Sequence, residues 1–173
     1  MKRRTALYAG AAAVAAAAGA GYAWWNYRLL PPAAGADPAF WGATLDTPNG
    51  EPLAMRSLLG QPLLVNFWAT WCPPCVEELP LLESFYQQQK AKGWRLLGIA
   101  IDQPSAVRNW LQRSPLSFSI ALGGLQGPEM SKQLGNAAGG LPFSVLFSAR
   151  GEVLDRKLGQ LSAADLSGWA GRV

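Results

Sequence analysis

The chain has 173 residues, with fifteen Lys and Arg, eleven Asp and Glu, two Cys and no His. Four of the basic residues, Lys2, Arg3, Arg4 and Arg28, precede residue 37, and every acidic residue lies at or after Asp37. The net charge of +4 therefore belongs to the N-terminal tail, which points to membrane topology and away from a nucleic-acid partner.

The N-terminal segment, residues 1–30, is predicted to be a signal anchor or transmembrane helix. The stretch from Thr5 to Asn26 carries no charge, and spanning a bilayer takes roughly 20 residues. Its basic start is expected to stay cytoplasmic, with the rest of the chain exported. Aromatic residues gather at its far end like an interfacial belt: Tyr22, Trp24, Trp25 and Tyr27.

A cleaved signal peptide is the alternative for this segment. Small-x-small sites occur at Ala18-Gly19-Ala20 and further on at Ala34-Gly35-Ala36. The length of the segment and its aromatic cluster favour the anchor. Residues 31–39, rich in Pro, Ala and Gly, are predicted to be a linker, and residues 40–173 to form one domain.

The first half of this domain reads as two short extended pieces around a turn at 46–50, then a helical turn at 55–59. A buried strand is expected at 63–69, because its residues are almost continuously apolar. A long helix is expected at 74–91, with Pro80 kinking it.

The second half of the domain also alternates between predicted strands and predicted helices. Strands are expected at 94–101 and 118–122, a hairpin at 143–148 and 152–157, and helices at 105–113, 128–134 and 162–170, the last with Ser162 as N-cap. This order predicts an α/β sheet that is parallel first and antiparallel later.

The two cysteines, Cys72 and Cys75, stand where the strand 63–69 passes into the helix. A Cys-x-x-Cys pair at such a junction indicates a dithiol/disulfide redox site, and a zinc site would need further Cys or His ligands. Pro73 and Pro74 fit the first helical turn, so the helix N-terminus stabilises the Cys72 thiolate. Cys72 is therefore expected to attack a client disulfide, and Cys75, one turn deeper, to resolve the mixed disulfide.

The run from Val65 to Cys75, followed by Glu78 and Pro80, resembles the TlpA/ResA-like family of membrane-anchored thiol–disulfide oxidoreductases. The similarity extends from about Phe40 to the C-terminus. It implies a thioredoxin-like fold, with a central mixed sheet flanked by helices behind one N-terminal anchor. It also implies a catalytic domain on the periplasmic or extracytoplasmic face of the inner membrane, and no cofactor beyond the Cys72–Cys75 disulfide.

Pro142 opens the strand 143–148, where proline is expected in any case. In thioredoxin-like proteins the matching proline is cis and lies against the cysteine pair, which makes a cis bond after Leu141 expected here. The backbone beside it can then pair with an extended substrate. The family commonly has Thr after this proline; Phe143 stands here and is expected to make the substrate groove more apolar.

Glu78 lies three residues after Cys75 and therefore on the same helix face. If burial raises its pKa, it can accept the Cys75 proton during resolution, a role that the resemblance supports. Asn66 stands where thioredoxin has a buried Asp, so it cannot take that proton. Trp71 and Pro73 are expected to form the surface around Cys72 on which partners dock.

The resemblance implies a reductase of disulfides in exported proteins that is re-reduced by a membrane thiol donor. An apocytochrome c and a copper-site protein are the two client classes considered. A redoxin-type thiol peroxidase is an alternative, but Thr70 stands two residues before Cys72, where the peroxidase loop has its Thr three before. A metallochaperone holding Cu(I) on the two thiolates is another.

Overall fold

The computed structural model describes residues 38–173. The predicted anchor, residues 1–30, and most of the predicted linker lie outside these residues. From residue 38 onward, no helix is both long enough and apolar enough to cross a membrane.

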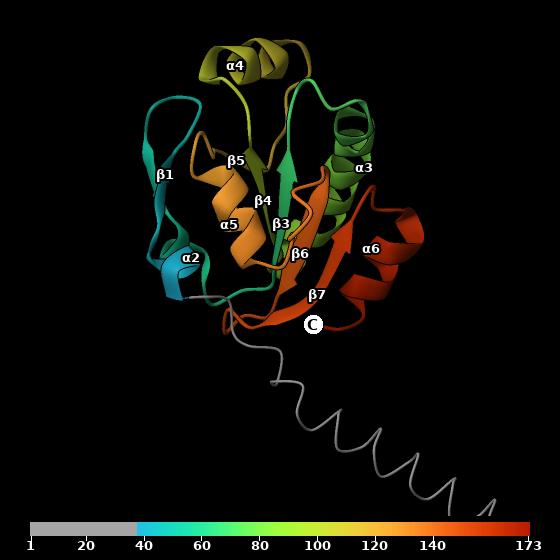
Figure 1. Cartoon of the computed structure of the whole chain (residues 1–173). Helices are drawn as coiled ribbons and strands as arrows, with labels where there is room; N and C mark the ends of the chain where they lie inside the picture. The colour runs from blue at the N-terminus through green and yellow to red at the C-terminus, as the bar shows by residue number, and fades with distance from the viewer. Residues whose placement is uncertain (1–37) are drawn as a thin grey trace, which may run out of the picture. The chain divides into compact units, whose positions relative to one another are not determined.

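A seven-stranded mixed sheet forms the centre of the domain, in the order β2-β1-β5-β4-β3-β6-β7. Strand β3 (Leu63–Trp68) pairs in parallel with β4 (Arg95–Ala100), which pairs in parallel with β5 (Ser119–Leu122). On its other side β3 pairs antiparallel with β6 (Phe143–Phe147), and β6 with β7 (Val153–Leu158). The predicted change from parallel to antiparallel pairing is confirmed (Figure 1).

The other edge of the sheet is a hairpin of β1 (Thr44–Asp46) and β2 (Pro52–Ala54) around the predicted turn. Asp46 pairs with Leu122, which joins this hairpin to β5. The predicted helical turn is the 3-10 helix η1 (Met55–Leu58). A short helix, α2 (Pro38–Gly42), precedes the hairpin and was not expected from the sequence.

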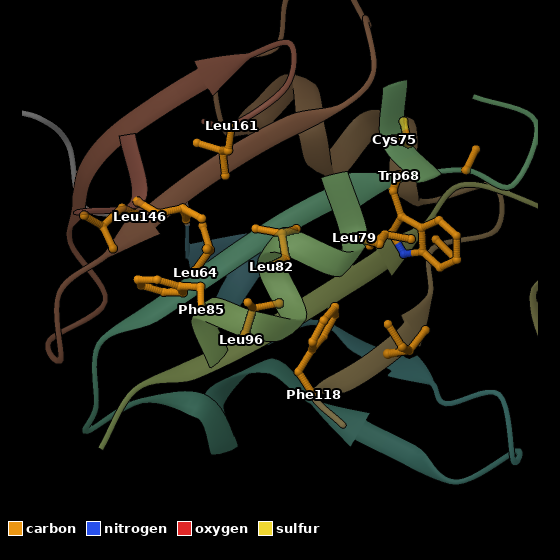
Figure 2. Packing of buried hydrophobic residues seen from close by; sticks show 14 of the residues in the cluster. Leu64, Trp68, Cys75, Leu79, Leu82, Phe85, Leu96, Phe118, Leu146 and Leu161 are labelled. Carbon is orange, nitrogen blue, oxygen red and sulfur yellow. The ribbon is translucent and has the colours of Figure 1, made fainter. Parts of the chain in front are cut away.

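Helices cover both faces of the sheet (Figure 1). Side chains of α3 (Pro73–Gln89), α4 (Pro104–Arg113) and α6 (Ala163–Ala170) join one hydrophobic cluster, part of which Figure 2 shows. Those of α2 and α5 (Gly127–Gln133) join the cluster on the other face.

Strand β3 contributes to both clusters, which explains its composition. Leu64 and Trp68 belong to the first cluster, and Val65 and Phe67 to the second. Every residue of β3 is buried, as expected for a central strand covered on both faces. The apolar run that predicted this strand therefore reflects burial on two sides, and the strand ends four residues before Cys72.

The closing helix α6 starts at the predicted cap. Ser162 Oγ accepts a hydrogen bond from the Asp165 N–H at 3.2 Å, and Asp165 Oδ2 accepts one from the Ser162 N–H at 2.7 Å. This reciprocal capping box satisfies two helix-end donors at once. It fixes the start of α6 directly after Leu161, a residue that contacts the candidate site.

Replacing the cap tests its contribution. Ser162→Ala should lower the free energy of unfolding by about 1 kcal/mol, because the Asp165 N–H loses its acceptor. Urea unfolding followed by tryptophan fluorescence measures the change. Ser167→Ala, at an exposed position inside the same helix, is the matched control. An equal loss in both variants would contradict the capping role.

Candidate active site

The two cysteines form a disulfide at the start of α3, with an S–S distance of 2.09 Å. Cys72 is the N-cap residue, and Pro73 and Pro74 occupy the first helical turn, as predicted. The Cys72 side of the pair is the accessible one, since Cys72 is 5% exposed and Cys75 is 0% exposed. The expected asymmetry between an attacking and a resolving cysteine is therefore present in the geometry.

Glu78 lies in the core one turn beyond Cys75, with only 3% of its surface exposed. Its Oε1 accepts a hydrogen bond from Asn66 Nδ2 at 2.7 Å, and its Oε2 accepts one from the backbone N–H of Leu161 at 2.7 Å. The carboxyl group is thus held at both oxygens by groups from β3 and from the loop before α6.

Burial raises the pKa of Glu78 above its ordinary value. The Leu161 N–H, the Asn66 amide and the nearby charge of Lys157 oppose this rise, because each favours the carboxylate. A carboxyl group with a raised pKa accepts a proton more readily near neutral pH. The structure therefore gives Glu78 the property that its expected role requires.

Asn66 connects the carboxyl group to β6. Its Nδ2 also donates to Ser144 Oγ at 2.9 Å, and both residues are completely buried. Asn66 Oδ1 is buried without a hydrogen-bond partner among the described residues. The orientation of the amide is therefore set by its two N–H groups, which donate to Glu78 Oε1 and to Ser144 Oγ.

Ser144 and Leu161 were not identified from the sequence. Ser144 lies directly opposite Asn66 in the antiparallel register of β3 and β6. The one available signal was a lone hydroxyl in the otherwise apolar strand Phe143–Phe147. Leu161 contributes only its backbone, which side-chain patterns do not report.

The peptide bond between Leu141 and Pro142 is cis, as expected. Pro142 is buried and its carbonyl accepts a hydrogen bond from the Gly159 N–H at 2.8 Å. Because Phe67 pairs with Phe143, Pro142 lies beside the end of β3 that leads to Cys72. Within residues 38–173 the half-buried Leu141 forms no backbone hydrogen bond, so its N–H and C=O are available for pairing.

The expectation for Phe143 is wrong as regards its side chain. The residue is 3% exposed, and its ring packs against Phe67 with ring centroids 6.0 Å apart in the cluster on the α5 side of the sheet. Successive strand residues point to opposite faces, so Ser144 faces Glu78 and Phe143 faces away. Phe143 therefore adds no exposed apolar surface to a substrate groove.

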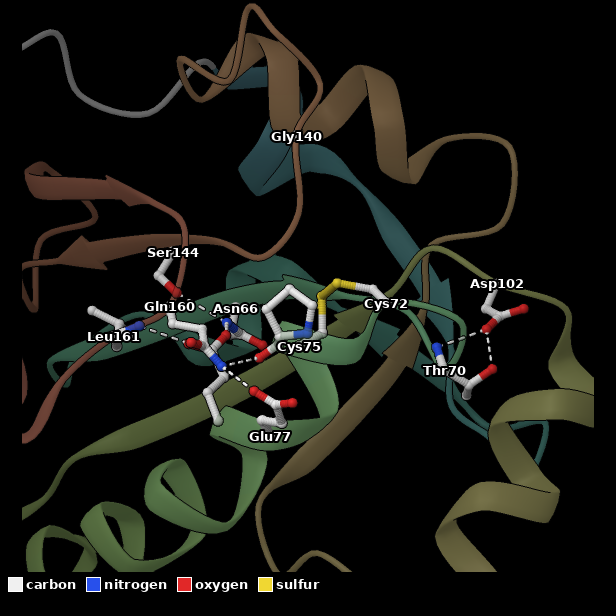
Figure 3. The surroundings of a disulfide bond; sticks show 12 residues. Asn66, Thr70, Cys72, Cys75, Glu77, Asp102, Gly140, Ser144, Gln160 and Leu161 are labelled. Atoms are coloured by element: carbon white, nitrogen blue, oxygen red, sulfur yellow. Dashed lines mark hydrogen bonds between the residues drawn. A yellow bond between two sulfur atoms is a disulfide. The ribbon is translucent and has the colours of Figure 1, made fainter.

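Trp71 is 65% exposed and Pro73 is exposed, which agrees with a docking surface around Cys72. The loop that carries Trp71 is held by Asp102, a residue that was not identified from the sequence. Asp102 Oδ2 accepts hydrogen bonds from the backbone N–H of Thr70 at 2.8 Å and from its hydroxyl at 2.5 Å (Figure 3). These hydrogen bonds attach the loop before Cys72 to the chain just after β4.

Comparison with known proteins decides the family. Residues 34–169 match the Redoxin family. The chain belongs to the redoxin family. Within it, the chain is 29% identical over 127 residues to a thiol-disulfide oxidoreductase ResA from Bacillus cereus, covering 72% of this chain and 70% of the relative.

Two further comparisons agree. The sporulation thiol-disulfide oxidoreductase A of Bacillus subtilis is 29% identical over 129 residues, covering 72% of this chain and 75% of that protein. The crystal structure of StoA from Bacillus subtilis is similar with a TM-score of 0.60 at 27% identity, covering 74% of this chain and 95% of that one. This redoxin is thus a thiol–disulfide oxidoreductase of the ResA-like type, with a thioredoxin-like fold.

The raised pKa of Glu78 has a consequence for stability. A folded state that binds this proton more tightly than the unfolded state is most stable below the ordinary pKa of Glu and loses that advantage as the pH rises through the folded-state pKa. Glu78→Gln should therefore flatten the fall in unfolding free energy of the oxidised protein as the pH rises from the ordinary pKa of Glu through its raised folded-state pKa. Urea unfolding across this range measures it.

The same variant should also be less stable at every pH, because an amide offers one acceptor oxygen where the carboxylate accepts two N–H groups. Glu77→Gln, on the exposed side of the same turn, is the matched control. If wild type and Glu78→Gln lose stability in parallel as the pH rises, Glu78 is not the group responsible.

Asn66→Asp places a second carboxyl group within 2.7 Å of Glu78. Two carboxylates at this separation cannot both ionise easily, so the pair should retain one proton well above the ordinary Asp and Glu range. Carbon-13 NMR titration of the carboxyl groups, with wild type as reference, measures this. Ordinary titration of both groups would contradict the observed contact.

Proposed function

We propose that this redoxin is a membrane-anchored, extracytoplasmic reductase of disulfides in exported client proteins. The observation that carries the proposal is the graded accessibility of the pair, with Cys72 5% exposed and Cys75 completely buried one helical turn before the buried carboxyl group of Glu78. The uncharged, apolar span of the N-terminal segment supports the anchor and the export.

The reaction begins with both cysteines reduced. The Cys72 thiolate attacks one sulfur of the client disulfide, a new S–S bond forms, and the other client sulfur leaves as a thiolate. The helix N-terminus stabilises the Cys72 thiolate, because Cys72 is the N-cap residue and the positive end of the helix dipole lies there. The product of this step is a mixed disulfide between Cys72 and the client.

Resolution requires Cys75 to lose its proton inside the core. Glu78 accepts this proton, since it lies one helical turn away and has a raised pKa. The Cys75 thiolate then attacks the Cys72 sulfur and expels the second client thiolate. The client leaves with two thiols, and the enzyme keeps the Cys72–Cys75 disulfide seen here.

Two electrons and two protons must then return to the pair. A membrane-bound thiol donor supplies them by the reverse exchange, again through Cys72. Client proteins whose cysteines must be reduced before they bind haem or copper fit this chemistry, which favours an apocytochrome c or a copper-site protein as the client. The unpaired backbone of Leu141 offers one hydrogen-bonding position for an extended client segment.

The equilibrium reduction potential of the pair tests the direction of the reaction. The full chain is equilibrated in glutathione or dithiothreitol buffers, and the reduced fraction is measured by thiol alkylation. A reductant should give roughly −250 mV or lower, because thioredoxin lies in that range. A value near roughly −120 mV would overturn the proposal in favour of an oxidant that installs disulfides.

A further inference from the structure

The two most exposed large apolar residues of the described domain line the same groove. Leu125 is 100% exposed and Trp71 is 65% exposed. The groove between them has a volume of about 590 Å³, and Ile101 and Asp102 also line it. Exposed apolar side chains gathered around a hollow indicate a binding surface more strongly than apolar residues scattered singly.

The glycines on either side of Leu125 bring the backbone of its loop close to β4. The Gly123 N–H donates to the carbonyl of Ala100 at 2.8 Å, and a Cβ on Gly123 would lie 2.9 Å from Ile99. A Cβ on Gly127 would lie 2.9 Å from Ile101. The loop from Gly123 to Gly127 therefore contacts the end of β4 through its backbone. The side chain of Leu125, at the centre of this loop, is exposed.

The loop that carries Trp71, on the other side of the groove, is attached near the same end of β4. The hydrogen bonds from Thr70 to Asp102 join the loop before Cys72 to the second residue after the strand. Both walls of the groove are thus attached to one central strand, which sets their separation. In Figure 3 the Thr70–Asp102 contact lies on the side of the disulfide away from Asn66 and Ser144.

The charges of the residues that line the groove indicate which kind of segment it can bind. Asp102 is the one charged side chain that lines it, and its oxygens already accept hydrogen bonds from Thr70 and from the Gln103 N–H. The lining offers no cation to an acidic segment. Trp71 also directly precedes Cys72, so a client cysteine in contact with Cys72 carries its neighbouring residues onto this surface.

We propose that Leu125 and Trp71 form an apolar clamp, which binds an uncharged, apolar side chain of the client close to its reactive cysteine. The inference rests on the proposed function, because it takes a disulfide-bearing polypeptide as the occupant. The clamp makes Leu125 a specificity-determining residue. It favours clients with Leu or an aromatic residue near the cysteine over clients with Ser or Glu there.

A single-turnover experiment with the full chain tests the clamp. The reduced enzyme reacts with short peptides that are closed by one disulfide, in which each other position in turn is Leu, Ser or Glu. The second-order rate constant is measured from the dithiol peptide formed. Wild type should prefer Leu over Ser by about five- to tenfold at one or more positions, as expected when a Leu side chain leaves water.

Leu125→Ser should abolish most of this preference, and the ratio of rate constants cancels any change in sulfur chemistry. Leu154→Ser is the matched control, since Leu154 is an exposed leucine on β7 that does not line the groove. An absent preference in wild type, its survival in Leu125→Ser, or an equal loss in Leu154→Ser would overturn the inference.

Two further outcomes distinguish a failure of the clamp from a failure of the proposed reductase function. If the reduced wild type converts none of the peptides, the reductase direction fails, and the clamp is then judged by the same ratios for oxidised enzyme and dithiol peptides. If Leu125→Ser changes the molar mass measured by sedimentation and leaves the ratios unchanged, the groove joins two copies of this chain and the clamp is wrong.

Discussion

The hydrogen bond between the Asn66 amide and the Glu78 carboxyl group is the contact on which the arrangement of the site depends. A carboxyl group in a core needs hydrogen-bond partners, and here they come from β3 and from the backbone before α6. Through Ser144 the same amide also reaches β6. The network therefore fixes the first turns of α3 against three separate parts of the domain.

The same buried hydrogen bonds affect both the stability of the domain and the surroundings of the cysteine pair. The burial that excludes water from Cys75 also raises the pKa of Glu78, so this carboxyl group and the cysteine pair share one environment. Asn66 has two N–H donors and does not titrate, so it orients the carboxyl group without adding a charge beside it. An apolar residue at this position would leave Glu78 without one of its two anchors.

Much of the fold and the cysteine chemistry was predictable, because both depend on local sequence. The apolar run of β3, the prolines after Cys72 and the Ser162 cap act over a few residues. Other contacts of the site depend on strand register and loop placement. Asn66 and Ser144 are separated by 78 positions in the sequence, and Glu78 and Leu161 by 83 positions. Phe143 was misjudged because its strand is apolar on both faces, so alternation does not show which side chain faces the cysteines.

The accessibility of the two sulfurs also constrains the order of binding events. Since Cys75 has no exposed surface, a disulfide partner and a thiol partner must both reach the enzyme through Cys72 and its immediate surroundings. The two partners therefore exclude each other, and no ternary complex carries electrons directly between them. Turnover must follow a ping-pong course, in which the oxidised enzyme releases one partner before it receives the other.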